Sequence, residues 1–116
     1  YDVHLNYSPI VVYNNYQEDY NKLFKLVDDI VDDSIKPKVK AECIFMTHNH
    51  KMHDYNLQNN VIGERLLWRP SIQENKISQY GSKNIRYKYQ QKRKYINNFV
   101  AHHNNIIPWQ TIRYIF

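Results

Sequence analysis

The chain has 116 residues, enough for one domain with a modest core, and a hydrophobic content of 42% excludes disorder by composition. The net charge of +5 is uneven, because residues 1–60 carry six Lys/Arg against nine Asp/Glu, whereas residues 61–116 carry ten against two. The single cysteine excludes an internal disulfide, and no run of about 18 apolar residues could span a membrane.

The first half of the chain is predicted to form a strand, a helix and a second strand. Val3–Tyr13 contains a candidate strand at Ile10–Tyr13, which is entered after Pro9. Across Tyr16–Val31, apolar residues recur at steps of three and four, which predicts an amphipathic helix. Asn15 followed by Glu18 matches a capping box at its start. Lys38–Thr47 alternates apolar and polar residues, which predicts the second strand.

Two features of this half have a simple structural interpretation. The last turns of the predicted helix carry aspartates that oppose the helix dipole. These aspartates are Asp28, Asp29, Asp32 and Asp33. We expect them to form either a solvated face or a contact with a basic neighbour. Cys43 lies in an apolar run and is expected to be a buried hydrophobic residue.

The second half is predicted to consist of short elements joined by polar loops. The expected order is an insertion loop at His48–Asn60, a strand at Ile62–Trp68, an extended loop at Ser71–Asn84, a strand from Ile85, a short helix at Val100–Asn105 and a closing strand at Thr111–Phe116. No flexible linker separates these segments, so the whole of 1–116 is predicted to be one domain, an α+β sandwich.

The stretch Ile85–Phe99 is the one around which the rest is organised. It begins with the period-2 alternation of a half-buried strand, with Tyr87 and Tyr89 toward the core and Arg86 and Lys88 on the other side. A dense basic patch follows at once. The pattern predicts a rigid strand that holds cations against a phosphate backbone.

Basic and aromatic residues alternate through this region in a way that suits RNA. Cations neutralise phosphates, and aromatic rings stack on unpaired bases. A solvated basic face is the alternative interpretation. We expect RNA contacts from Arg69, Ser71, Lys76, Tyr80, Lys83, Arg86, Lys88, Lys92, Arg93 and Lys94.

A catalytic or metal-binding role has less support. His48, His50 and His53 form a possible metal site, but structural zinc sites usually take ligands from two segments and often use thiolates. A polar loop rich in histidine is the preferred interpretation, so no metal is predicted. With no nucleophile elbow and no Gly-rich phosphate loop, neither an enzyme nor a cofactor is expected.

Three segments resemble the small-subunit ribosomal protein ten family in a divergent mitochondrial form. Residues 67–72, L-W-R-P-S-I, look like the family's L-R-S-P-H-V segment. Residues 82–96 are similar to its K-S-R-E-Q-F-E-I-R-T-H-K-R-L-I, and residues 106–115 to its ending D-L-P-A-G-V-D-V-E-I. Two departures are a longer segment that contains the histidines and a shortened second helix.

The resemblance implies a ferredoxin-like βαββαβ sandwich with a long basic loop. It also implies a structural constituent of the mitochondrial small ribosomal subunit head, located in the mitochondrial matrix. The partners would be small-subunit ribosomal RNA and neighbouring ribosomal proteins, with no membrane and no small-molecule substrate. The alternatives are a non-ribosomal interaction subunit of an organellar or viral assembly, and a metal-dependent enzyme that uses the three histidines.

Overall fold

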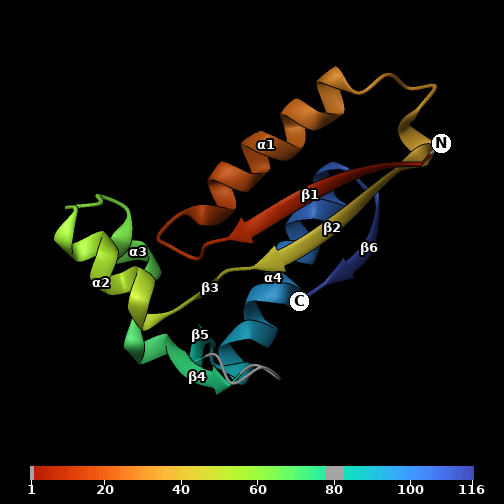
Figure 1. Cartoon of the computed structure of the whole chain (residues 1–116). Helices are drawn as coiled ribbons and strands as arrows, with labels where there is room; N and C mark the ends of the chain where they lie inside the picture. Colours follow the sequence, from red (N-terminus) through yellow and green to blue (C-terminus); the bar gives the residue numbers. More distant parts are fainter. Residues whose placement is uncertain (1, 78–82) are drawn as a thin grey trace. The chain divides into compact units, whose positions relative to one another are not determined.

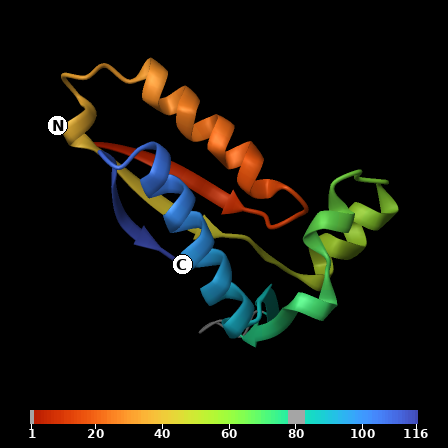
Figure 2. The same ribbon diagram turned by 180° about the vertical axis from the view of Figure 1, so that it is seen from behind.

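The computed structural model describes residues 2–77 and 83–116, and the chain divides into two compact units (Figures 1 and 2). Unit 1 comprises Tyr1–Phe45 and Lys94–Phe116, and unit 2 comprises Met46–Arg93. No helix among the described residues is both long and apolar enough to cross a bilayer.

Unit 1 is a parallel three-stranded sheet with helices on one face. Its elements are β1 (Val3–Ile10), α1 (Tyr16–Ile30), the short 3-10 helix η1 (Lys36–Lys38), β2 (Val39–Phe45), the greater part of α4 (Tyr89–Ile106) and β6 (Thr111–Ile115). The strand order is β1-β2-β6, and both pairings are parallel. Parallel neighbours need crossover connections, which are almost always right-handed, so two crossovers in the same direction bring α1 and α4 to the same face (Figure 2).

Aromatic side chains fill the space between the sheet and the two helices. Phe99 of α4 lies at the centre, with ring centroids 5.1 Å from Tyr20, 5.5 Å from Phe24, 6.0 Å from Tyr7 and 6.2 Å from Phe45. All four pairs meet edge to face, the arrangement that the ring quadrupole favours. This cluster joins β1, β2, α1 and α4 into one core.

A buried polar network closes one part of this core. The hydroxyl of Tyr7 donates to Oε1 of Gln110 at 2.9 Å, and Nε2 of His103 lies 2.8 Å from the same oxygen. All three residues are buried. The network therefore fixes the turn before β6 against β1 and α4.

The predicted helix and second strand of the first half are confirmed as α1 and β2, whereas the first strand is Val3–Ile10 and not Ile10–Tyr13. β2 buries Val39, Ala41, Cys43 and Phe45 on one face, as the alternation required. Burial raises the pKa of the Cys43 thiol to about 12, as expected of a buried hydrophobic residue. The prediction of a capping box is wrong, because the backbone of Asn15 is left-handed and its side chain makes no capping hydrogen bond.

One of the four aspartates has a defined basic and aromatic partner. The indole Nε1 of Trp109 donates to Asp28 at 2.8 Å, and Nζ of Lys36 lies 3.1 Å from the same carboxylate. These two hydrogen bonds, that of Trp109 first, hold the pKa of Asp28 below its usual range. The interpretation of these aspartates as contacts with a basic neighbour is therefore correct for Asp28. Lys36 also pairs with Asp33 at 2.8 Å.

The sheet face turned away from the helices carries a small polar cluster. Glu42 accepts hydrogen bonds from Tyr114 at 2.7 Å and from Arg113 at 3.1 Å, and Nδ1 of His4 lies 2.5 Å from it. The bond with His4, followed by that with Tyr114, holds the pKa of Glu42 below its ordinary value.

This cluster predicts a loss of stability of unit 1 in acid. Because the pKa of Glu42 is lower in the folded chain, its contribution is complete above the unfolded value of about 4.3 and is lost as the pH falls through the folded value. The urea midpoint of the wild type should therefore exceed that of Glu42→Gln near neutral pH, and the gap should close in acid. A gap that is constant with pH would contradict this prediction.

Unit 2 is a small antiparallel sheet with two short helices. Its elements are β3 (Thr47–His48), α2 (His50–Gln58), α3 (Glu64–Leu67), the 3-10 helix η2 (Pro70–Ile72), β4 (Gln73–Ile77), β5 (Lys83–Tyr87) and the first residues of α4. The strand order is β3-β5-β4. β5 buries Ile85 and Tyr87 and turns Arg86 to the opposite side, as predicted.

Several predictions for the second half are wrong. Most of the expected loop at 48–60 is helix α2, the expected strand at 62–68 contains helix α3, and most of the described part of the loop at 71–84 belongs to η2, β4 and β5. A side-chain cap explains α2, since Asn49 accepts a hydrogen bond from the backbone N–H of Met52 at 2.7 Å.

The basic stretch after β5 is helical and not extended. α4 begins at Tyr89, so residues 91–94 belong to its first turns and the second helix is longer than predicted. Tyr89 is 66% exposed, which corrects the prediction that it faces the core. Its ring lies 5.9 Å from the guanidinium of Arg93, one helical turn later, a cation–π contact.

The coarse fold prediction is confirmed, because the chain combines helices with small sheets. The ferredoxin-like arrangement is not confirmed, since the strands form two separate three-stranded sheets.

Candidate functional site

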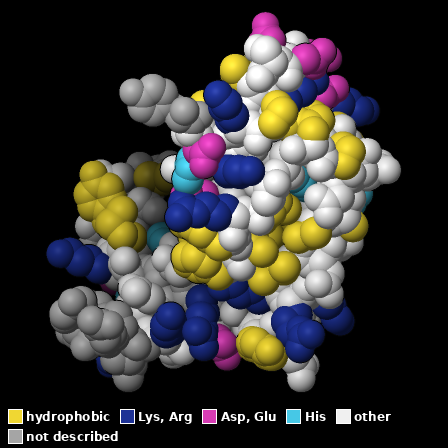
Figure 3. Space-filling view, turned by 90° about the vertical axis from the view of Figure 1, so that its right-hand side faces the viewer, with side chains coloured by type: hydrophobic (Ala, Val, Ile, Leu, Met, Phe, Trp, Pro, Cys, Tyr) yellow, Lys and Arg dark blue, Asp and Glu magenta, His cyan; other side chains and the backbone are white. Residues whose placement is uncertain are grey.

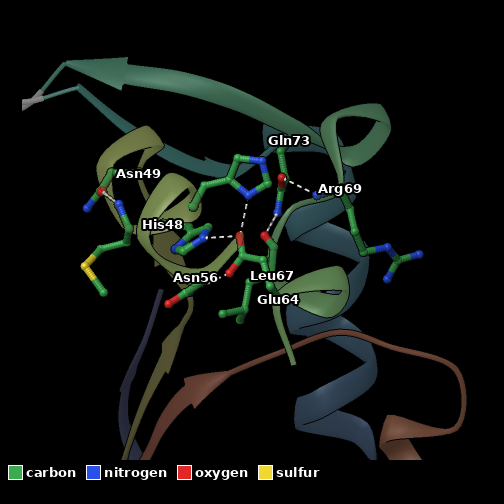
Figure 4. A network of polar contacts seen from close by, with 9 residues as sticks. His48, Asn49, Asn56, Glu64, Leu67, Arg69 and Gln73 are labelled. Carbon is green, nitrogen blue, oxygen red and sulfur yellow. Dashed lines mark hydrogen bonds and ion pairs between the residues drawn. The ribbon is translucent and has the colours of Figure 1, made fainter. Parts of the chain in front are cut away.

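Two histidines converge on one buried carboxylate in unit 2. Oε1 of Glu64 lies 2.8 Å from Nε2 of His48 and 2.5 Å from Nδ1 of His53. The other carboxylate oxygen, Oε2, accepts a hydrogen bond from the amide of Asn56 at 2.6 Å (Figure 4). We call these four residues the His–Glu cluster.

Each member of the cluster comes from an element that fixes its position. His48 lies in β3 and pairs with Ile85 of β5 in the sheet. His53 and Asn56 are three residues apart in α2 and so share one face of that helix. Glu64 is the first residue of α3. Only 5% of the Glu64 side chain and 8% of the His48 side chain are exposed, so the cluster is held inside the unit.

The indole of Trp68 fixes one of the two imidazoles. Its ring is stacked on that of His53, with 3.9 Å between centroids and 8° between planes. Trp68 also meets His50 edge on at 4.9 Å. The stack restricts rotation of the His53 ring and keeps Nδ1 directed at Glu64.

Hydrogen bonds favour the ionised form of the Glu64 carboxylate although it is buried. Burial by itself would raise the pKa of Glu64, but the hydrogen bonds from Asn56, His53 and His48 together outweigh it, and the pKa lies below its usual range. The three hydrogen bonds replace the hydration that the carboxylate loses on burial.

A hollow in the surface of unit 2 reaches the cluster. It has a volume of about 400 Å³, and its lining includes His53, Asn56, Glu64 and Trp68. Solvent and small ions therefore have a route to the side of the cluster that these residues form.

Among the described residues, His48, His53 and Glu64 form the one group of three whose metal-ligating atoms all lie within 4.8 Å of one another. The sequence indicated His48 and His53 but grouped them with His50, which is exposed and is not part of the cluster. Glu64 was missed. Its signal was weak: it is the one acidic residue between Asp54 and Glu74.

A second feature of unit 2 is the basic hairpin, which we define as β4, β5 and the residues from Lys88 to Arg93 that follow them. In its register Glu74 lies opposite Arg86, and Lys76 lies opposite Asn84. Arg86 and Glu74 form an ion pair at 3.2 Å between partly exposed side chains.

Cations crowd one another in the basic hairpin. The pKa of Lys92 is lowered, first by partial burial and then by the positive charges of Arg86 and Lys76. The pair with Glu74 leaves a surplus of positive charge there, since Glu74 is the only acidic residue of the hairpin sequence. The face drawn in Figure 3 likewise carries more Lys and Arg than Asp and Glu side chains.

The structure brings only some of the predicted RNA-contacting residues into this hairpin: Lys76, Lys83, Arg86, Lys88, Lys92 and Arg93. Arg69 directly precedes η2, and its backbone N–H donates to Gln73 at 2.7 Å. Its side chain points away from the His–Glu cluster (Figure 4). Ser71 is exposed in η2, and Lys94 lies in the part of α4 that belongs to unit 1. Tyr80 lies outside the described residues. RNA contact by these residues stays a prediction.

The sequence matches no known protein-family model and no curated protein. The fold, however, is similar to that of spore photoproduct lyase. A double mutant of that enzyme with bound AdoMet and dinucleoside spore photoproduct has a TM-score of 0.82 at 14% identity over 100% of this chain. The enzyme complexed with dinucleoside spore photoproduct gives 0.80 at 13% identity over 97%. The chain spans about a third of the length of these proteins, 34% and 33%.

These similarities overturn the ribosomal interpretation. The resemblance to the ribosomal protein ten family, the structural role in a small ribosomal subunit and the link to translation are wrong, because the fold matches an enzyme of another kind over the whole chain. The short matches were misleading because two of them lie across η2 and across the start of α4, where the local structure differs from the loop and strand expected. The prediction that the chain is no enzyme also conflicts with neighbours that are an enzyme.

Proposed function

We propose that this chain is part of a nucleic-acid-modifying enzyme and that the basic hairpin of unit 2 binds the phosphate backbone of its substrate. The observation that carries the proposal is that the pairing register turns Lys76 and Arg86 to the same face of the hairpin, whose sequence has Glu74 as its only acidic residue. Like charges repel, so such a cluster is stabilised when an anion binds it. Nucleic acid supplies anionic groups at regular spacing.

The similarity of fold supports this class of substrate. Spore photoproduct lyase has been solved with a dinucleoside, and this chain has the fold of about a third of that protein. At 13–14% identity the fold alone is shared, so the substrate is proposed from the cations of this chain together with that fold.

In unit 1, the Glu42–Arg113 pair does not offer a site for AdoMet, which is named in one of the similar structures. Its amino-acid group needs a carboxylate and a cation that are available for pairing. On the open face of the sheet, Glu42 and Arg113 already pair with each other at 3.1 Å. We therefore assign no step to AdoMet and no AdoMet ligand to this chain.

The proposal is tested by the salt dependence of binding to a single-stranded oligonucleotide, followed by fluorescence anisotropy. The variant replaces Lys76, Lys88 and Lys92 by glutamine. Each lost phosphate contact should reduce the slope of log K against log salt by about 0.7, so the slope should fall by about 2. The affinity at low salt should fall with it.

A matched control replaces three exposed lysines elsewhere, Lys22, Lys25 and Lys51, by glutamine. It has the same net charge as the test variant but an intact basic hairpin, so its slope should stay close to that of the wild type. Equal losses in the two triple variants, or no binding by the wild type at low salt, would overturn the proposal.

A further inference from the structure

We propose that His48, His53 and Glu64 bind one divalent transition-metal ion, for which Zn²⁺ is the probe. The three candidate ligand atoms, His48 Nε2, His53 Nδ1 and a carboxylate oxygen of Glu64, lie within 4.8 Å of one another. This inference does not rest on the proposed function, because none of the three residues belongs to the basic hairpin.

The donor set selects the class of metal. Imidazole suits Zn²⁺ and its neighbours among the transition metals, whereas Ca²⁺ and Mg²⁺ prefer oxygen ligands throughout. Two imidazoles and one carboxylate also form the protein part of catalytic zinc sites, which leave a fourth position for water. The hollow that His53 and Glu64 line provides room for that ligand.

The distances are compatible with a site that loads by a small movement. In a tetrahedral zinc site with bonds of about 2.0–2.1 Å, neighbouring ligand atoms are about 3.3 Å apart. Glu64 Oε1 now lies 2.8 Å from His48 and 2.5 Å from His53, as hydrogen bonds require. An ion that replaces the bridging protons would move each of these two pairs apart by less than about 1 Å. The ligand atoms of His48 and His53, which lie within 4.8 Å of each other, would come together by no more than about 1.5 Å.

The surrounding residues hold the ligands as outer-shell groups do in metal proteins. Asn56 donates to Oε2 of Glu64 at 2.6 Å and so leaves Oε1 for the metal (Figure 4). Trp68 stacks on His53 and sets the plane of its ring. The ligands come from β3, α2 and α3, so the ion would tie three elements of unit 2 together.

The experiment is a competitive titration of the chelator-stripped chain with Zn²⁺ against a chromophoric chelator. We expect one Zn²⁺ per chain with the wild type. His48→Gln, His53→Gln and Glu64→Gln should each lower the affinity by about 100-fold or more, since loss of an outer-shell group alone costs about 10–100-fold.

The matched control is His50→Gln, which removes a histidine from the same helix as His53 but no ligand. It should keep the wild-type affinity. An equal loss in His50→Gln and His53→Gln would mean adventitious binding by surface histidines and would overturn the proposal, as would the absence of stoichiometric binding by the wild type.

A second measurement needs no variant that could fail to fold. Co²⁺ bound by the wild-type chain should give the intense visible absorption of a tetrahedral site, and one equivalent of Zn²⁺ should remove it. A weak octahedral spectrum would overturn the proposed geometry.

Replacement of Asn56 by alanine should lower Zn²⁺ affinity by about 10–100-fold while the stoichiometry stays at one.

Discussion

Replacement of Phe99 by alanine is expected to destabilise unit 1 by about 3–5 kcal/mol, the cost of removing a buried phenyl ring from a packed core. Phe99 is only 1% exposed, and its ring contacts aromatic residues of β1, β2 and α1. The cavity would lie where these elements meet, so neighbouring rings could not close it without moving the helices off the sheet.

The measurement is urea unfolding followed by tryptophan fluorescence. The two tryptophans lie one in each unit, Trp109 in unit 1 and Trp68 in unit 2, so a Trp68→Phe background restricts the signal to unit 1. Phe116→Ala is the matched control, since Phe116 is in the same unit but 55% exposed. It should cost no more than about 1 kcal/mol. Similar losses in both variants would contradict the central position of Phe99.

Elements whose burial follows a simple period could be predicted from the sequence. β2 alternates strictly, and its four inward residues are all buried. Helix α1 has apolar residues at helical spacing, although the structure buries only Tyr16, Phe24 and Val27 fully. The closing strand β6 follows Pro108 and was placed within one residue of its observed end. Local pattern was sufficient here because each element packs through one face.

The sequence predicted only the last turns of helix α4, because its buried stripe is partly polar. Ile96, Phe99 and His103 follow one another at steps of three and four, which is helical spacing. However, His103 is buried through a hydrogen bond to Gln110, and a histidine does not count as apolar in a periodicity argument. The alternating tyrosines before it gave a strand signal that is correct only as far as Tyr87.

The candidate site could be predicted only in part. The histidine-rich segment drew attention to His48 and His53, but spacing alone also included His50. Glu64 lies eleven residues beyond His53 in a segment that the sequence predicted to be a strand. Only the folding of α2 and α3 brings its carboxylate to the two imidazoles, and no local pattern encodes that contact.

Replacement of Glu64 by alanine is expected to destabilise unit 2 by about 3–5 kcal/mol, with the chain kept free of metal by a chelator. The change leaves two imidazole donors and the amide of Asn56 without their shared acceptor. Each buried donor that loses its ionised acceptor keeps a desolvation cost of about 1–3 kcal/mol, so three such donors account for a loss of this size. Glu64→Gln should cost less, because its amide oxygen can still accept one of these bonds.

The signal of Trp68 in a Trp109→Phe background reports on this unit, and Trp68 stacks directly on His53. Glu74→Ala is the matched control: it removes a carboxylate from the same unit, but one that is partly exposed and paired with Arg86 on the surface. Exposed pairs contribute about 0–1 kcal/mol, so the control should remain close to the wild type. If Glu64→Ala also stays within about 1 kcal/mol of the wild type, the carboxylate is not what holds α2 and α3 against the sheet.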